Sequence, residues 1–397
     1  MSTQIIALRK KFSNNRRYLQ APFTAFNLVN RKTVINRLNL NWSEQDLPEK
    51  ERTKHVHRLH PYLGKFIPQL VEIFLRKYSP KCVLDPFCGS GTTLVEALSL
   101  GIDSIGCDVS SFNCLVSKVK TDKYNLELLE KEVKDIRYKL SSFCNRDLFT
   151  YEAPKTANNY LNTWFAPKAL EELLFFKSLI PNYRYQDLFK VVLSRAARSA
   201  RYVPHHELDF PKKPQIEPYH CRKHRRICTP VDEAFKFLDR YCLDAFIRIK
   251  YFSEIRTKAT VKIYNADSRK IKLPPFDFVF TSPPYVGLID YHEQHRYAYE
   301  LLELPKREEL EIGPASKGVS KEAKNRYIEG INFVWANIIK SLKDGGILAI
   351  VVGDKWGLYN AKQAGFKEID RIKRHVNRRT GRRNSDFYEE VLIWRKL

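Results

Sequence analysis

The sequence predicts an α/β fold in which a doubly wound, largely parallel sheet carries a largely helical inserted domain. The first observation is a strand, a glycine-rich turn, a helix and a second strand that follow one another over residues 82–108, the start of a Rossmann-like sheet. The second is the return of strand-like runs from 260 onward. The third is the segment between them, 123–259, which has helical patterns and far exceeds the usual connection of about two to six residues.

The individual elements follow from apolar spacing and from chain-breaking residues. Apolar residues recur at helical spacing from 66 to 75, and this helix should end before Pro80 because proline disfavours helical backbone at the residue before it. The expected helices are 66–78, 92–100, 126–141, 167–179, 231–252 and 326–342, and the expected strands are 82–84, 103–107, 260–264, 277–280, 346–352 and 389–394.

These elements divide the chain into three expected parts. Residues 1–54 are polar and basic with weak periodicity, so they form either an N-terminal arm or a peripheral subdomain. The sheet domain takes residues 55–122 and 260–397, and the inserted domain takes 123–259.

The composition indicates a folded protein with a polyanionic partner. Lys and Arg number 69 against 45 acidic residues, giving a formal charge of +24, and such an excess favours nucleic acid because each neutralised phosphate releases a counterion. Ribosome-associated and membrane-surface proteins share this property. Since no run approaches the roughly 18 apolar residues of a membrane span, and the N-terminal apolar run is too short for a signal peptide, we expect a soluble, cytoplasmic protein.

The eight cysteines are scattered, without the dense spacing of a disulfide scaffold. One region has the residue types of a zinc site: His220, Cys221, His224, Cys228 and Cys242. There is no CxxC pair, however, and the neighbouring Arg and Lys residues fit nucleic-acid contact equally well. We therefore assign no metal and leave open whether zinc binds near Cys221 and Cys228.

A loop at 85–93, DPFCGSGTT, lies where the first strand passes into a helix, the place where open α/β sheets bind ligands. Gly89 and Gly91 permit sharp turns and close approach of a ligand. A dinucleotide fingerprint would need glycine where Leu94 stands, and a phosphate-binding loop would need Gly-Lys-Ser/Thr. Neither nicotinamide nor ATP is therefore favoured. Asp108, at the end of the next strand, is placed to accept hydrogen bonds from ribose hydroxyls.

This loop resembles the DPFxGSGTT motif of amino-group DNA methyltransferases. The resemblance implies S-adenosyl-L-methionine as cofactor, with its methionine part over Gly89–Gly91, its amino group near Asp85, its ribose at Asp108 and its adenine near Asp267. The segment 60–66 resembles the family segment that closes over the methionine end. The implied cofactor residues are Tyr62, Lys65, Asp85, Phe87, Gly89, Ser90, Gly91, Thr92, Asp108 and Asp267.

The second motif, Ser282-Pro283-Pro284-Tyr285 preceded by Thr281, also follows an apolar strand. An exocyclic amino group is a poor nucleophile because its lone pair is delocalised into the ring. The Ser282 hydroxyl and the Pro283 carbonyl would accept its hydrogens and localise that pair, while Tyr285 would stack on a flipped base. Alone, the tetrapeptide is also compatible with a rigid loop or a proline-rich ligand. No Pro-Cys dipeptide occurs, which disfavours covalent methylation of cytosine carbon 5.

In the family that the motif resembles, serine at the first position is typical of N4-cytosine enzymes, and Asp or Asn of N6-adenine enzymes. Ser282 therefore predicts N4 of cytosine in a flipped-out base, with N6-adenine methylation as the alternative. An RNA guanine-N2 methyltransferase and a non-catalytic DNA-binding protein are further alternatives. The resemblance also implies the modification half of a restriction-modification system, with double-stranded DNA and a cognate restriction endonuclease as partners. We expect a monomer.

Two basic segments are the predicted DNA contacts. One spans 195–226, where cations alternate with aromatic and histidine side chains, and the other spans 371–383, expected to be a loop before the last strand. A merely solubilising surface is the alternative for the first. The candidates are Arg195, Arg198, Arg201, Lys212, Lys213, Arg222, Lys223, Arg225, Arg378, Arg379, Arg382 and Arg383.

Overall fold

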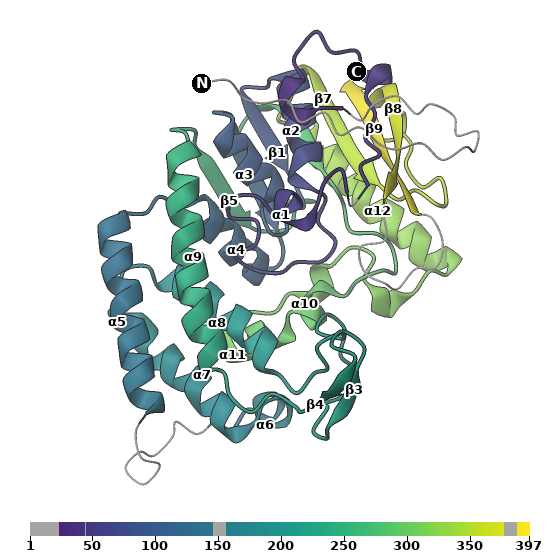
Figure 1. The fold of residues 1–397 in the computed structure, drawn as a ribbon. Helices are drawn as coiled ribbons and strands as arrows, with labels where there is room; N and C mark the ends of the chain where they lie inside the picture. The colour runs from purple at the N-terminus through teal and green to yellow at the C-terminus, as the bar shows by residue number, and fades with distance from the viewer. Residues whose placement is uncertain (1–23, 44, 146–155, 377–386) are drawn as a thin grey trace, which may run out of the picture.

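In the computed structural model, which describes residues 24–43, 45–145, 156–376 and 387–397, a seven-stranded sheet occupies one half of the molecule and helices fill the other (Figure 1). The strand order is β5-β2-β1-β6-β7-β9-β8. The first five strands are parallel, and β9 runs antiparallel to both of its neighbours. The strands are β1 (Cys82–Asp85), β2 (Asp103–Asp108), β5 (Val261–Asn265), β6 (Phe276–Thr281), β7 (Leu342–Val352), β8 (Phe366–Val376) and β9 (Phe387–Lys396).

Both faces of the sheet are buried, which is why its central strands are almost continuously apolar. Successive side chains alternate between the faces: Val83 and Phe278 pack in one apolar cluster, and Leu84 and Val279 in another. The helices of the sheet half are α2 (Pro68–Tyr78), α3 (Thr92–Ser99), α4 (Ser111–Thr121) and α12 (Lys321–Ile338). Helix α2 covers the first face and α12 the second.

The described part of the N-terminal segment belongs to the first of these faces. Leu40, Trp42 and Leu47 are buried in the same cluster as α2. Further along, the Lys54 ammonium lies 2.6 Å from the Glu72 carboxylate of α2 and 2.7 Å from the Glu96 carboxylate of α3. Residues 24–43 and 45–54 therefore pack on the sheet half instead of extending from it as a free arm. This part includes η1 (Phe26–Leu28), η2 (Ile35–Arg37) and α1 (Glu49–Arg52).

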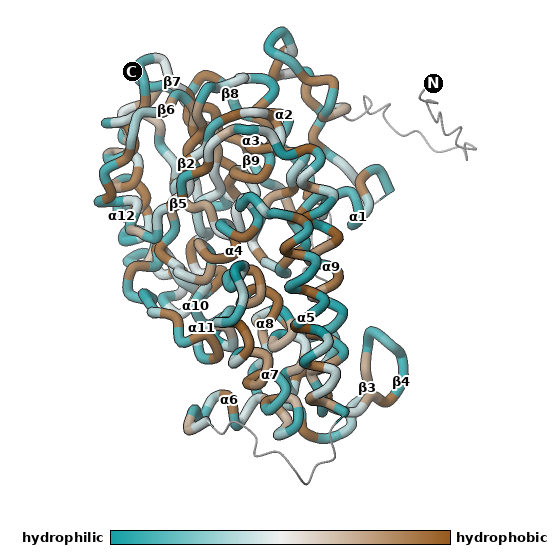
Figure 2. Tube along the Cα trace, turned by 90° about the vertical axis from the view of Figure 1, so that its left-hand side faces the viewer, coloured by the Kyte–Doolittle hydropathy of each residue, from teal (hydrophilic) through white to brown (hydrophobic). Residues whose placement is uncertain are grey.

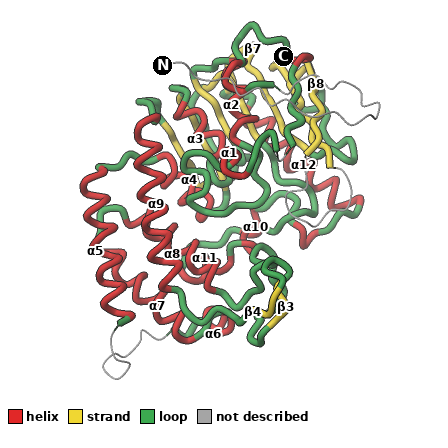
Figure 3. The backbone as a smooth tube through the Cα atoms, viewed as in Figure 1, coloured by secondary structure: helices red, strands yellow, loops and turns green. Residues whose placement is uncertain are grey.

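The helical half lies between α4 and β5 in the sequence, and Figure 3 shows its concentration of helices. It contains α5 (Leu126–Cys144), α6 (Asn159–Trp164), α7 (Pro167–Leu179), η3 (Ile180–Asn182), α8 (Gln186–Ala200) and α9 (Phe235–Ile255), with the hairpin β3 (Tyr219–Cys221) and β4 (Arg226–Cys228). In Figure 2 the tubes of α5 and α9 alternate between hydrophilic and hydrophobic, as expected for helices that bury one face.

Helices that follow β6 in the sequence connect the two halves. After β6 come α10 (Tyr291–Gln294) and α11 (Arg296–Leu302), then η4 (Glu308–Leu310) and η5 (Ala315–Lys317). Helix α11 buries Ala298 and Leu301 in the same cluster as the helical half, and α4 contributes Phe112 and Val116 to it. The two halves therefore share a continuous apolar core beneath the edge of the sheet.

Two sequence predictions need correction. The run 371–383 was expected to be a loop, but its first part is β8, where Arg371 lies 2.8 Å from Glu390 and Arg374 lies 2.6 Å from Glu389 of the neighbouring strand. The charged residues of this run do not look like a strand in the sequence, because the acidic partners that neutralise them lie on the neighbouring strand. Helix α8 was also not predicted, since its cations were interpreted as a surface feature.

Among the described helices, none is long and apolar enough to cross a membrane.

Candidate active site

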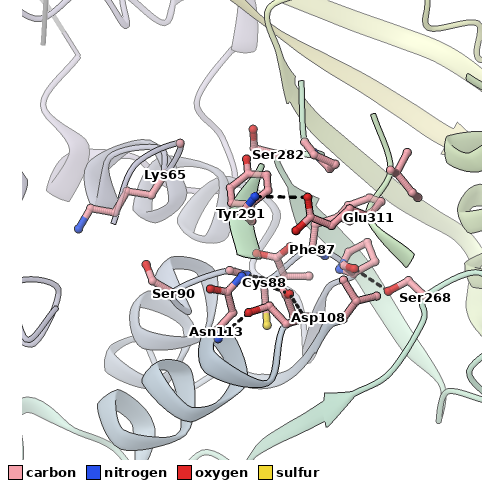
Figure 4. Close-up of a pocket in the computed structure, with 18 of the residues that line it drawn as sticks. Lys65, Phe87, Cys88, Ser90, Asp108, Asn113, Ser268, Ser282, Tyr291 and Glu311 are labelled. Atoms are coloured by element: carbon pink, nitrogen blue, oxygen red, sulfur yellow. Dashed lines mark hydrogen bonds between the residues drawn. The ribbon is translucent and has the colours of Figure 1, made fainter. Parts of the chain in front are cut away.

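The two sequence motifs meet at the edge of the sheet where its parallel strands end. Strands β1, β2 and β6 are neighbours, so their last residues, Asp85, Asp108 and Thr281, lie at the same edge. A cavity of about 840 Å³, including its open mouth, lies there. In Figure 4, Ser282 and Tyr291 lie on one side of it and Ser90, Asp108 and Asn113 on the other. The predicted cofactor residues that line it are Tyr62, Lys65, Asp85, Phe87, Gly89, Ser90, Thr92, Asp108 and Asp267.

The glycine turn is held in place from behind by α4. The Ser117 hydroxyl donates a hydrogen bond to the Gly89 carbonyl oxygen over 2.8 Å, and the buried Lys120 ammonium donates one to the Ser90 carbonyl oxygen over 2.8 Å. Gly91 has φ +77°, and a Cβ there would lie 2.8 Å from the Ser117 hydroxyl. Gly91 does not line the cavity itself, so it serves the shape of the turn.

Asp108 is held in the cavity by three hydrogen-bond donors. Its carboxylate accepts hydrogen bonds from the backbone N–H groups of Gly89 (2.8 Å) and Ser110 (2.9 Å) and from the Asn113 amide (3.2 Å). Burial raises the pKa of Asp108 even though these donors favour its charged form. Within the described residues, the Ser90 hydroxyl and the side-chain Oδ1 atom of Asn113 are buried without a hydrogen-bond partner. Such orphaned polar atoms fit a polar ligand in this cavity.

Asp85 links the two motifs directly. The Thr281 hydroxyl donates a hydrogen bond to the Asp85 carboxylate over 2.6 Å, and both side chains are almost fully buried. Burial raises the pKa of Asp85 to about 6. This bond ties the residue before the tetrapeptide to the first residue of the glycine loop, a contact that sequence reasoning did not predict.

The tetrapeptide 282–285 reaches the cavity with only part of its length. Ser282 and Pro284 line the cavity, whereas Pro283 is buried. The Tyr327 hydroxyl donates a hydrogen bond to the Pro284 carbonyl oxygen over 2.8 Å, and the Tyr285 hydroxyl donates one to Glu389 over 3.4 Å. Contacts from α12 and β9 thus fix the backbone after Ser282.

Three further predicted cofactor residues, Tyr62, Lys65 and Asp267, have different surroundings. The Tyr62 hydroxyl accepts a hydrogen bond from Asn113 (3.1 Å), and its ring stacks on His295 with centroids 5.4 Å apart. The Lys65 ammonium donates to the His57 carbonyl oxygen over 3.1 Å and points away from the middle of the cavity (Figure 4). Burial disfavours the charge of Asp267, but its hydrogen bonds to Arg269, the nearer guanidinium contact being 2.8 Å, lower its pKa below the ordinary value.

Several lining residues lie outside the predicted set. Glu311, from the loop after η4, accepts hydrogen bonds from the backbone N–H groups of Tyr291 (3.3 Å) and His292 (2.9 Å). Ser268 donates to the Pro86 carbonyl oxygen over 2.6 Å. Tyr291 and His292 fall in the stretch just after the tetrapeptide, which is a usable sequence signal. No motif marks Glu311, because only the folded loop brings it to the cavity.

Two predicted DNA contacts, Arg195 and Arg201, are instead buried in the helical half, and a third, Arg198, is half-buried there in an ion pair. Arg195 is 8% exposed, lies 2.6 Å from Asp244 and covers the Tyr241 ring. Arg201 is 3% exposed and donates to the Leu208 carbonyl oxygen, and Arg198 pairs with Asp209. A guanidinium that is buried and already paired does not reach a phosphate, so this part of the prediction is corrected.

The remaining DNA candidates fall into two groups. One group is exposed on the segment around the hairpin β3–β4: Lys212, Lys213, Arg222, Lys223 and Arg225. The other group lies outside the described residues: Arg378, Arg379, Arg382 and Arg383.

Of the five zinc candidates, Cys221, His224 and Cys228 gather in the structure, and they are joined by His205, whereas His220 and Cys242 are not in the group.

Comparison with known proteins agrees with this geometry. The family model N6_N4_Mtase, a DNA methylase, matches residues 9–118. The type II methyltransferase M.MjaII of Methanocaldococcus jannaschii is 38% identical over 87% of this chain and 81% of its own length. The type II methyltransferase M.MvaI of Kocuria varians is 26% identical over 58% of this chain and 53% of its own length, so this chain spans about half of that relative.

Among solved structures, TrmN from Thermus thermophilus matches 84% of this chain and 50% of its own chain, with 13% identity and a TM-score of 0.31. The sequence relationship to M.MjaII carries the assignment, because it extends over most of both chains. The chain belongs to the amino-group DNA methyltransferases, site-specific enzymes whose cofactor is S-adenosyl-L-methionine.

Proposed function

We propose that this DNA methyltransferase modifies N4 of a cytosine that is flipped out of double-stranded DNA. The observation that carries the proposal is the position of Ser282. It lines the same cavity as Asp85 and Asp108, and Thr281 before it is hydrogen-bonded to Asp85. An acceptor for the target amino group and the polar groups for the cofactor therefore meet in one cavity.

The cofactor supplies an electrophilic methyl group on its sulfonium. Asp85 is the group proposed to face its amino group, and Asp108 the group proposed to hold its ribose. The glycine turn is proposed to lie under the methionine part. The unpartnered Ser90 hydroxyl and the side-chain Oδ1 atom of Asn113 offer further hydrogen bonds. Asp267 and Tyr62 line the same cavity and complete the proposed set.

The tetrapeptide is proposed to activate and orient the amino group. The Ser282 hydroxyl and the Pro283 carbonyl oxygen accept its hydrogens, which localises the nitrogen lone pair for direct transfer. Because each proline has a fixed φ and Tyr327 holds the Pro284 carbonyl oxygen, these acceptors need little reorganisation. The ring of Tyr285, whose hydroxyl donates to Glu389, offers a face on which the flipped base stacks.

The choice of cytosine rests on the residue type at position 282. In the family that the motif resembles, serine there is typical of N4-cytosine enzymes. An N6-adenine enzyme, typically with Asp or Asn at that position, is the competing proposal, and the same experiment separates the two.

The helical half is proposed to recognise the DNA target. We assign residues 55–122 and 260–397 to the catalytic domain and 123–259 to the recognition domain. The support is the set of exposed cations near the hairpin, which are free of the burial that occupies Arg195 and Arg201. A role as the modification partner of a restriction endonuclease follows from the same family resemblance.

The test is to express the protein in cells that lack other DNA methyltransferases, digest their DNA and quantify modified nucleosides by mass spectrometry. We expect N4-methylcytosine with the wild type and far less of it with Ser282→Ala, provided that both proteins bind the cofactor in calorimetry. N6-methyladenine without N4-methylcytosine would refute the cytosine assignment.

A map of the modified positions tests the restriction-modification role. We expect methylation at one short recurring sequence, with DNA so modified resisting an endonuclease that cleaves that sequence. Methylation scattered over unrelated sequences would contradict site-specific protection.

A further inference from the structure

A second cluster of reactive side chains lies in the helical half, away from the cavity. It brings together the Nδ1 atom of His205, the Sγ atom of Cys221, the Nδ1 atom of His224 and the Sγ atom of Cys228, all within 4.8 Å of one another. Cys221 Sγ lies 3.6 Å from His224 Nδ1 and 3.9 Å from His205 Nδ1, and His224 Nδ1 lies 3.4 Å from Cys228 Sγ.

These separations match the edges of a tetrahedral metal site. With Zn–S bonds of about 2.3 Å and Zn–N bonds of about 2.0–2.1 Å, a tetrahedron places sulfur and nitrogen about 3.6 Å apart. Two thiolates and two imidazoles are the ligands that Zn²⁺ prefers in closed structural sites, and the two thiolates balance its charge. We propose that His205, Cys221, His224 and Cys228 bind one structural zinc ion.

The local fold presents these ligands from two segments. Strand β3 pairs Cys221 with Arg226 of β4, and Tyr219 with Cys228, so both cysteines point to the same face of the hairpin. His224 comes from the turn, where Arg225 has φ +53°. His205 comes from the loop after α8, so an ion bound here joins the hairpin to the end of that helix.

The hairpin has little else to stabilise it. Its two strands are three residues each and pair only with each other in the described sheets. The buried side chains of these strands are the two cysteines, while Ile227 is 65% exposed. An isolated two-stranded hairpin is marginally stable in water, and a metal that closes it supplies the missing free energy.

The Tyr219 hydroxyl lies 2.8 Å from His205 Nδ1 and also accepts a hydrogen bond from the His205 backbone N–H over 3.0 Å. Metal binding takes the Nδ1 lone pair and leaves Tyr219 bonded to the backbone N–H. The change at this position is therefore the exchange of one hydrogen bond for one coordination bond.

The site has a consequence that rests on the proposed function. The exposed cations Arg222, Lys223 and Arg225 are on the hairpin turn between the two cysteines. A zinc ion would fix the direction of this basic turn toward DNA. None of the four ligands lines the cofactor cavity, so removing the metal should weaken DNA binding and leave cofactor binding unchanged.

The test measures metal in the untagged full chain, purified without chelators, by mass spectrometry of the elements. We expect about one zinc per chain. Cys228→Ser and His205→Gln should lower zinc affinity at least about 10–100-fold, since even loss of a supporting contact has that effect. Cys242→Ser and His220→Gln are matched controls and should retain the metal. Calorimetry with S-adenosylmethionine shows for each variant that the sheet half is folded.

Cobalt substitution gives a second readout that needs no variant. Co²⁺ bound to the wild type should show a thiolate charge-transfer band and the visible spectrum of a tetrahedral ion, and an octahedral spectrum would overturn the proposal. It is also overturned if the wild type neither contains nor takes up zinc, if Cys228→Ser keeps its zinc, or if intact-mass measurement finds Cys221 and Cys228 joined as a disulfide. These results do not depend on methylation, so they are separate from a failure of the proposed function.

Discussion

The edge of the sheet and the helical half both bury charged side chains, but they leave them in different states. At the edge, Asp85 is buried and Asp108 is half-buried, both beside hydrogen-bond donors, and both line a cavity. In the helical half, Arg195 is buried against Asp244 and an aromatic ring, and it lines neither of the two described cavities. A buried charge that faces a cavity is available to a ligand, whereas one closed by its partner stabilises the fold.

This difference predicts that substitutions in the two regions fail in different ways. Changes at the sheet edge should alter catalysis or cofactor binding at nearly constant stability. Changes at the paired cations of the helical half should alter stability, and only the exposed cations should alter DNA binding.

The largest effect is expected for Ser282→Ala. Removing one preorganised polar contact of the reacting group should lower single-turnover methyl transfer by about 10²–10³-fold. The dissociation constant of S-adenosylmethionine should stay within about threefold, because Ser282 is proposed to contact the target base. A threefold change is well below the 1.4 kcal/mol of a tenfold difference. Transfer at the wild-type rate would remove Ser282 from the mechanism.

Arg195→Ala should act on stability. It leaves Asp244 partly unpaired, and we expect the free energy of unfolding to fall by about 1–3 kcal/mol; this is less than for a fully buried pair, because Asp244 keeps Arg248 at 3.0 Å. Thermal unfolding measures the change, with Lys190→Ala on the exposed side of α8 as the control. Weaker DNA binding at unchanged stability would instead place Arg195 at the DNA.

Cofactor binding should depend on pH through Asp85. Since burial raises its pKa to about 6, the carboxyl is ionised at pH 7.5 and largely protonated at pH 5, where it no longer attracts the cofactor amino group. We expect the affinity for S-adenosylmethionine to fall about tenfold over this range. In Asp85→Asn, binding should be weak and nearly independent of pH; an unchanged pH dependence in that variant would assign it to another group.

The raised pKa of Asp85 also makes the free energy of unfolding depend on pH. Burial raises the pKa of Asp85 above the ordinary value of an aspartate, so the folded protein holds this proton more tightly than the unfolded chain. The contribution of this group to the free energy of unfolding is therefore largest at low pH and decreases as pH rises through the window between the two pKa values.

The smallest effect is expected for Lys223→Ala. Loss of one exposed phosphate contact should weaken DNA binding a few-fold and reduce the slope of log K against log salt by about one. The free energy of unfolding should change by no more than about 0.5 kcal/mol. Lys367→Ala, exposed on β8, is the control, and an equal loss of DNA binding there would indicate nonspecific attraction.

The motifs of the sheet edge were predictable because their place in a parallel sheet follows from local order. A residue at or directly after the end of an apolar strand must lie at the carboxyl end of that strand, so the places of Asp85, Asp108 and Ser282 follow from the order of the residues. The contact between Thr281 and Asp85 was not predictable, because it joins residues 196 positions apart and depends on β1 and β6 being neighbours.

The sequence by itself determined the α/β class and the places of the glycine loop and of the tetrapeptide 282–285 at strand ends, since each depends on short-range patterns. Only the tertiary structure decided which cations are paired and which are exposed, and that His205, rather than His220, lies beside Cys221 and Cys228. The physical reason is that charge and ligand type are properties of a residue, whereas pairing and coordination depend on distances between segments that the chain order does not contain.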